Sequence, residues 1–95
     1  MEEQDRRRFE FLVAIFEATD GGSSMKNVHL NDLAAKLAIT FSEAYGEFDY
    51  LRGEGLAQVR DIGGYIGLTP SGRVVVEDAM RLPSSEPRLE PPGSL

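Results

Sequence analysis

The sequence predicts a small α+β domain with a three-helix core, a short strand, a β-hairpin and an additional C-terminal helix. Apolar residues recur at helical spacing near the N-terminus and again between residues 30 and 53. Residues 56–62 and 65–68 flank Gly63-Gly64, which is the pattern of a hairpin. Thr69 then precedes Pro70, a combination typical of a helix start.

Composition limits the chain to one domain and a few classes of function. The protein has 95 residues, 41% of them hydrophobic, and no Cys, which excludes disulfides and thiolate sites. Residues 1–80 contain 8 Lys and Arg against 14 Asp and Glu, so they carry the whole net charge of −6. Proteins that bind nucleic acid normally gather positive charge on one face, so this balance argues against that function.

The first helix is expected over residues 4–19 and is apolar on two sides. Phe11 and Ile15 lie nearly opposite the main stripe, so a second surface has to cover them. Asp20-Gly21-Gly22 is expected to end this helix. The stripe expected to face the core comprises Phe9, Leu12, Val13 and Phe16.

Two further helices follow a very short strand at residues 28–30. Asn31 or Asp32 is expected to cap the first of them, and residues 39–43 supply a turn and a second cap. Gly53 and Gly55 end the second helix. The residues expected to face inward are Leu33, Ala34 and Leu37 on the first helix, and Ala44, Phe48 and Leu51 on the second.

A last helix is expected through residues 74–80, although three consecutive valines are poor helix formers. The composition changes after Leu82, where Pro, Ser, Glu and Gly predominate. We therefore predict a folded domain at residues 1–82 and a disordered tail, rich in Pro and Ser, at residues 83–95.

Three motifs together resemble the winged helix-turn-helix superfamily, in particular small bacterial transcriptional regulators. They are Asp32-Leu33-Ala34-Ala35-Lys36-Leu37, Leu51-x-x-Glu54-Gly55-Leu56 and Leu68-Thr69-Pro70-Ser71-Gly72. The resemblance implies that residues 42–52 form a recognition helix and that the hairpin forms the wing. All three motifs are packing or turn signals, so they indicate a scaffold and leave its function to the exposed residues.

The first functional hypothesis is a dimeric DNA-binding regulator of transcription. The helix at residues 42–52 would enter a major groove, and the hairpin would contact the backbone of double-stranded DNA. The candidate DNA-binding residues are Lys36, Ser42, Tyr50, Arg60, Tyr65 and Arg73.

The second hypothesis is a protein-interaction module that docks a basic protein surface and binds little or no DNA. The side of the recognition helix expected to be exposed carries three carboxylates, which phosphates would repel. The candidate contact residues are Glu43, Glu47, Asp49 and Tyr50. The alternative interpretation of these carboxylates is a solvated helix face without a partner.

A homodimer is expected because Phe11 and Ile15 need cover. Either the valine-rich last helix folds back over them, or the same helices of a second chain do so. The candidate interface residues are Phe11, Ile15, Val74 and Val75. The triplet Arg6-Arg7-Arg8 is interpreted as a salt-bridged first turn, with DNA contact as the alternative.

No pattern in the chain indicates an enzyme. His29 is the sole histidine, Ser71 has no base placed beside it, and Gly63-Gly64 lacks the Lys-Ser or Lys-Thr of a phosphate-binding loop. We expect no metal site, no cofactor and no catalytic residue. Without a long apolar run or a signal-type segment, the protein is expected to be cytoplasmic, without membrane contact.

Overall fold

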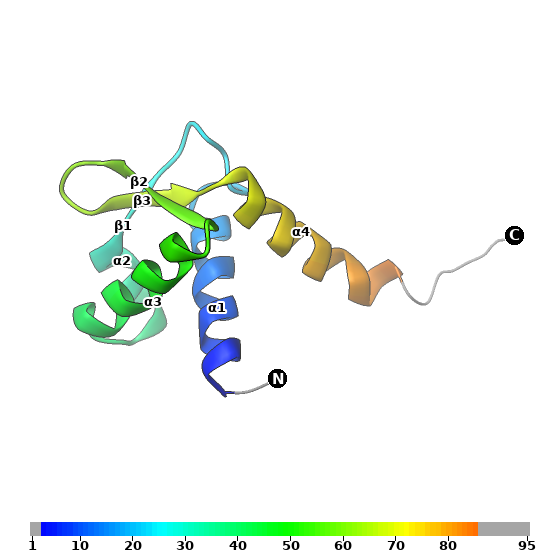
Figure 1. Cartoon of the computed structure of the whole chain (residues 1–95), viewed down its shortest axis with the longest axis horizontal. Coiled ribbons are helices and arrows are strands. Elements are labelled where there is room, and N and C mark those ends of the chain that lie inside the picture. Colours follow the sequence, from blue (N-terminus) through cyan, green and yellow to red (C-terminus); the bar gives the residue numbers. More distant parts are fainter. Residues whose placement is uncertain (1–2, 86–95) are drawn as a thin grey trace, which may run out of the picture.

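The computed structural model describes the backbone of residues 3–85 and the side chains of residues 3–81. Within this part, four helices and a three-stranded antiparallel sheet form an α+β fold (Figure 1). This confirms the expected α+β class. In chain order the elements are α1 (Glu3–Ala18), β1 (Val28–His29), α2 (Leu30–Leu37), α3 (Phe41–Gly53), β2 (Ala57–Asp61), β3 (Tyr65–Leu68) and α4 (Pro70–Ser85).

The sheet has the strand order β1-β3-β2, so the hairpin supplies two strands and β1 adds a short third one. Val28 of β1 lies opposite Ile66 of β3. The hairpin turns at Gly63 and Gly64, whose φ angles of 92° and 97° suit glycine. Pairing of β2 with β3 shifts between Val59 and Asp61, which places a bulge at Arg60.

Short polar caps define the two central helices. Thr40 accepts a hydrogen bond from the Glu43 backbone N–H at 3.0 Å, and the Thr40 N–H donates to the Glu43 carboxylate at 2.9 Å, completing a capping box. At α2 the sequence prediction was wrong. The helix begins at Leu30, and His29 caps it by accepting from the Asn31 N–H at Nδ1, 3.0 Å away.

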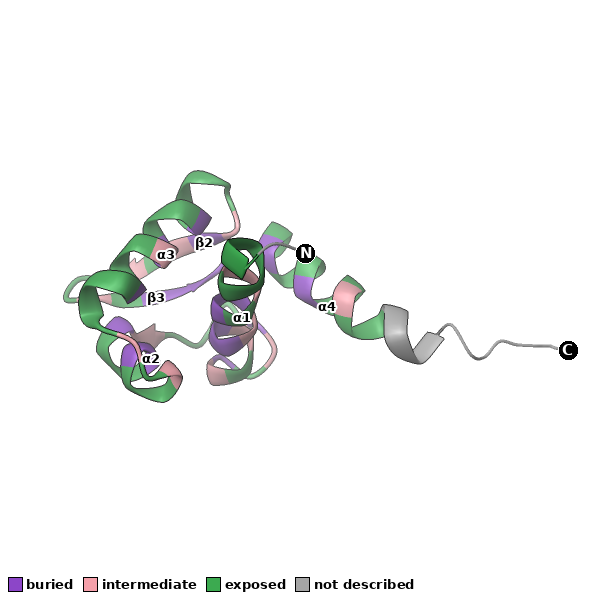
Figure 2. Cartoon of the chain, turned by 90° about the horizontal axis from the view of Figure 1, so that it is seen from below, coloured by how far each residue is buried: buried purple, intermediate pink, exposed green. Residues whose placement is uncertain are grey.

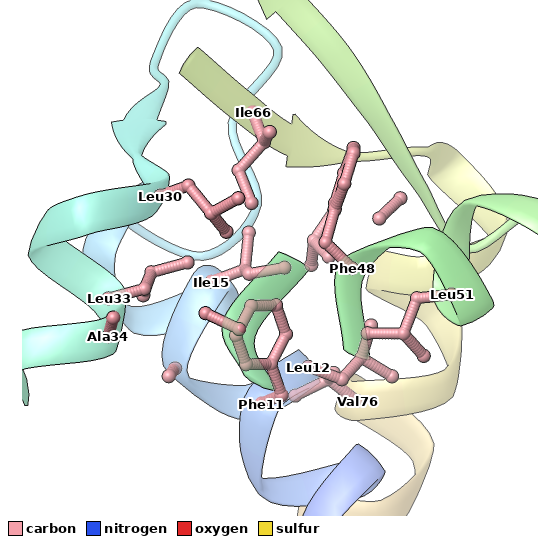
Figure 3. Packing of buried hydrophobic residues seen from close by; sticks show 14 residues of the cluster. Phe11, Leu12, Ile15, Leu30, Leu33, Ala34, Phe48, Leu51, Ile66 and Val76 are labelled. Carbon is pink, nitrogen blue, oxygen red and sulfur yellow. The ribbon is translucent and has the colours of Figure 1, made fainter. Parts of the chain in front are cut away.

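The core uses a different face of α1 from the one predicted. Phe11 and Ile15 are exposed by only 1% and 0%, and they lie among side chains from α2, α3 and the sheet (Figure 3). The predicted stripe is buried only at Leu12, because Phe9, Val13 and Phe16 stay partly exposed. Phe11 and Ile15 are therefore core residues, and their assignment to a dimer interface is corrected.

Helix α4 begins against the body and then projects from it (Figures 1 and 2). Thr69 caps it as predicted, because its hydroxyl oxygen accepts from the Gly72 N–H at 3.0 Å. Gly72 and Val76 are buried, whereas most later side chains up to Arg81 are exposed. The helix ends at Ser85, beyond the predicted boundary at Leu82. Of the predicted tail, residues 86–95 lie outside the described residues.

Candidate functional site

The predicted acidic surface of α3 is neutralised by contacts within the chain. Arg7 lies 3.7 Å from the Glu43 carboxylate, and Arg8 lies 3.9 Å from that of Glu47. Both arginines come from the first turns of α1, so two members of the basic triplet contact another helix. Among residues 3–81, the interpretation of the triplet as pairs within its own helix holds for Arg8 with Asp5 alone, at 3.9 Å.

Glu47 faces α1 instead of solvent. Its side chain is 15% exposed, and its Oε1 atom is buried without a hydrogen bond among the described residues. Tyr50, one helical turn further along, lies under the Arg8 guanidinium, whose carbon is 3.6 Å from the ring centroid. Glu47 is therefore mostly covered by α1, which corrects the expectation that it stands free on α3. Tyr50 contacts Arg8 but remains 41% exposed.

Glu43 also has a local structural role. The backbone N–H and the hydroxyl of Thr40 both donate to its carboxylate, and these hydrogen bonds, with a smaller contribution from Arg7, lower the Glu43 pKa below its ordinary value. Asp49 pairs with Arg52, the one basic residue within α3. Each of the three candidate carboxylates thus already has a cationic partner in the chain.

The surface of α3 that faces away from the body carries two aromatic rings, small residues and the paired charges of Asp49 and Arg52. Phe41 and Tyr45 are each 51% exposed, and their rings stack with centroids 6.4 Å apart. Gly46 and Ser42 beside them carry small side chains or none. We call this exposed surface the outer face of α3; its residues are Phe41, Ser42, Tyr45, Gly46 and Asp49.

The candidate DNA-binding residues do not form one surface. Lys36 lies on α2, with its ammonium 4.0 Å from the Glu17 carboxylate of α1. Tyr65 packs against the ring of His29, edge to face, at a centroid distance of 4.9 Å. Ser42 stands on the outer face of α3, where the nearest cation is already paired. The structure brings together only Arg60 and Arg73 of the predicted set.

Arg60 and Arg73 line one cavity of about 180 Å³. The cavity lies between the loop after α1, the base of the hairpin and the first turn of α4, all of which meet near the top of the molecule in Figure 1. We call it the arginine cavity. It is lined by Gly22, Ser24, Arg60, Leu68, Pro70 and Arg73.

Of the predicted dimer residues, Val74 and Val75 are exposed, by 50% and 39%. They project from different sides of α4, because consecutive helical residues are about 100° apart. Val75 borders the buried Val76 and continues into Ala79 and Met80, whereas Val74 lies with Asp78 on the opposite side. We call Val75, Ala79 and Met80 the apolar strip of α4.

Comparison with known proteins found no matching family model, curated protein or solved structure. The function is therefore argued from the geometry of this chain. Across residues 3–85, no helix has the length and apolar character required to cross a membrane. Nor do three or more His, Asp or Glu side chains of the described residues gather as a metal site would require.

Sequence reasoning missed four residues of these surfaces. Arg7 and Arg8 were assigned to their own helical turn, since sequence alone does not show which helix end lies beside them. Phe41 was counted as part of a turn, and Tyr45 was not among the candidate contact residues. Their i, i+4 spacing was the available signal that both rings share one side of the helix.

Proposed function

We propose that this chain is a non-catalytic protein-interaction module with a winged-helix architecture. The strand order β1-β3-β2 and the short connection between α2 and α3 support that architecture. The observation that carries the function is the outer face of α3, where two exposed, stacked aromatic rings stand on a surface whose charges are paired. Protein interfaces are typically enriched in aromatic residues and depleted of free carboxylates.

The partner surface is apolar instead of basic. Glu43, Glu47 and Asp49 already have arginine partners, so a basic surface would have to displace Arg7, Arg8 and Arg52. Phe41 and Tyr45 need no such exchange, because their rings are available to bury apolar area directly. Gly46 adds a position at which another backbone can approach closely, since nothing lies within 4 Å of an added Cβ there.

DNA binding by α3 is the competing hypothesis. A titration with a generic 20-base-pair duplex at about 50 mM and about 200 mM salt distinguishes the two, because phosphate contacts weaken steeply with salt. We expect no salt-sensitive binding that depends on Ser42 or Tyr45. Duplex binding at about 50 mM salt that weakens at about 200 mM and is lost in the Ser42→Asp and Tyr45→Asp variants would contradict the proposal.

A direct test places a photo-crosslinking amino acid at Tyr45. The matched control carries it at Ala35, which is exposed on α2 away from the outer face of α3. We expect a defined protein adduct in the native cell from position 45 that is absent from position 35. Equal labelling from both positions, or no adduct at either, would count against this face.

We propose that a second copy of the chain covers the apolar strip of α4. A single projecting helix gains little stability without packing along its apolar side, and α4 leaves the body after Val76. Two such helices related by a two-fold axis would bury Val75 and Met80 against each other. Light scattering should give a dimer that Val75→Glu with Met80→Glu converts to a monomer, whereas Val74→Glu leaves it dimeric. A monomeric native protein would exclude this arrangement.

A further inference from the structure

The arginine cavity is lined by two arginines whose side chains lie closely against glycines. Arg60 lies across Gly67, so closely that a Cβ on Gly67 would come within 2.6 Å of the Arg60 Nε atom. Arg73 lies against Gly22 in the same way, and a Cβ there would be 3.1 Å from Arg73 Cγ. Larger residues at positions 22 and 67 would force both side chains to move.

Only some of the hydrogen-bond donors of the Arg60 side chain have acceptors among the described residues. Its Nη2 atom donates to the Leu68 carbonyl oxygen at 2.7 Å, which fixes the direction of the guanidinium. Its Nε–H is buried and has no hydrogen-bond acceptor among the described residues. It also forms no ion pair with a described carboxylate. A buried donor without an acceptor is uncommon, so this guanidinium keeps hydrogen-bonding capacity that the described residues do not use.

Arg73 brings the second charge and is weakly compensated. Its closest carboxylate, Glu77, lies one turn further along α4 at 4.0 Å, and both side chains are almost half exposed. An exposed pair at that distance contributes little. The remaining walls are Ser24, which can offer a hydroxyl, and the start of α4 at Pro70. The cavity therefore concentrates positive charge within an acidic protein.

The size and chemistry of the cavity fit a phosphate group. Guanidinium groups donate parallel hydrogen bonds that match phosphate oxygens, and two of them balance a dianion. One water molecule needs roughly 10–15 Å³ of such space, so about 180 Å³ admits a tetrahedral oxyanion with a small substituent. We propose that the arginine cavity binds inorganic phosphate or a small phosphomonoester. This site does not depend on the function proposed for α3.

Calorimetric titration of the full chain with sodium phosphate, and in parallel with methyl phosphate, tests the site against sodium chloride at equal ionic strength. We expect saturable binding of one phosphate per chain. Arg60→Gln and Arg73→Gln should each weaken it by at least about tenfold, as expected for loss of a charge-assisted hydrogen bond. The control Lys36→Gln removes the same charge from α2 and should leave the affinity unchanged.

Gly67→Ala provides a variant that displaces Arg60 without removing its charge. The clash falls on a flexible side chain instead of the backbone, so the fold should persist while phosphate binding weakens. Circular dichroism confirms folding of each variant. The proposal would be overturned if the native chain did not bind phosphate at 10 mM. It would also be overturned if the Arg60→Gln and Arg73→Gln variants bound phosphate as tightly as the native chain. A third outcome would also overturn it: the chain binds duplex DNA through Arg60 and Arg73 but does not bind free phosphate. The cavity would then be a contact for the DNA backbone.

Discussion

The Arg8 guanidinium lies over the Tyr50 ring, with its carbon 3.6 Å from the ring centroid, so the start of α1 contacts the C-terminal half of α3. The same side chain approaches Glu47 at 3.9 Å. Arg8 therefore contacts both the Tyr50 ring and the largely buried Glu47 carboxylate. This contact explains why the N-terminal arginines lie against α3.

Replacing Arg8 by Gln should lower the free energy of unfolding by about 1–2 kcal/mol, because the cation–π contact is lost and Glu47 keeps a buried charge without its partner. The matched variant Arg6→Gln removes the same charge from an exposed position and should change stability by less than about 0.5 kcal/mol. Urea unfolding followed by circular dichroism measures both. Equal effects would mean that Arg8 acts only through net charge.

Glu43→Gln should remove part of the acid sensitivity of the fold. The Thr40 hydrogen bonds lower the Glu43 pKa in the folded protein, so this group contributes stability above its unfolded pKa and loses it as the pH falls through the folded value. Between pH 7 and pH 3 the variant should therefore lose less stability than the native chain. Glu54→Gln removes the same charge from an exposed position at the other end of α3 and is the matched control.

Two glycine substitutions should have opposite effects. A Cβ at Gly72 would lie 2.0 Å from the Leu56 carbonyl oxygen, so Gly72→Ala should cost about 3 kcal/mol or prevent folding. At Gly46 nothing lies within 4 Å of an added Cβ, and Gly46→Ala within α3 should stabilise the protein by about 0.5–1 kcal/mol. Thermal unfolding of the two variants beside the native chain tests the contrast.

Two truncations on α1 test which of its faces packs in the core. Ile15→Ala removes a fully buried side chain and should cost about 2–5 kcal/mol. Val13→Ala acts on the partly exposed side and should cost about 1 kcal/mol or less. If the Val13 variant were the less stable of the two by denaturant unfolding, the packing of α1 described above would be wrong.

Local signals in the sequence were enough to predict the elements. Thr69 before Pro70 marked the start of α4, Gly63-Gly64 marked the hairpin turn, and Thr40 lay in the predicted cap of α3. Each of these depends on backbone geometry within a few residues, which the identity and order of those residues specify. The α+β class followed from their order.

The errors arose where distant segments decide the outcome. Two apolar stripes on α1 were visible, yet the sequence does not contain the crossing angles that direct Ile15 into the core and leave Val13 partly exposed. His29 became a cap because β1 ends beside α2, a placement set by its pairing with β3. Arg60 and Gly67 met across a bulged hairpin, and no spacing rule predicts that contact.

The bulge at Arg60 has a consequence for assembly. Strand β2 is an edge of the sheet, where unpaired N–H and C=O groups could recruit a strand from another molecule. The extra residue interrupts the regular backbone spacing along that edge, and Asp61 adds a charge next to it. The short, kinked edge is a poor template for strand addition, so copies of this chain should resist fibre formation and associate through helices.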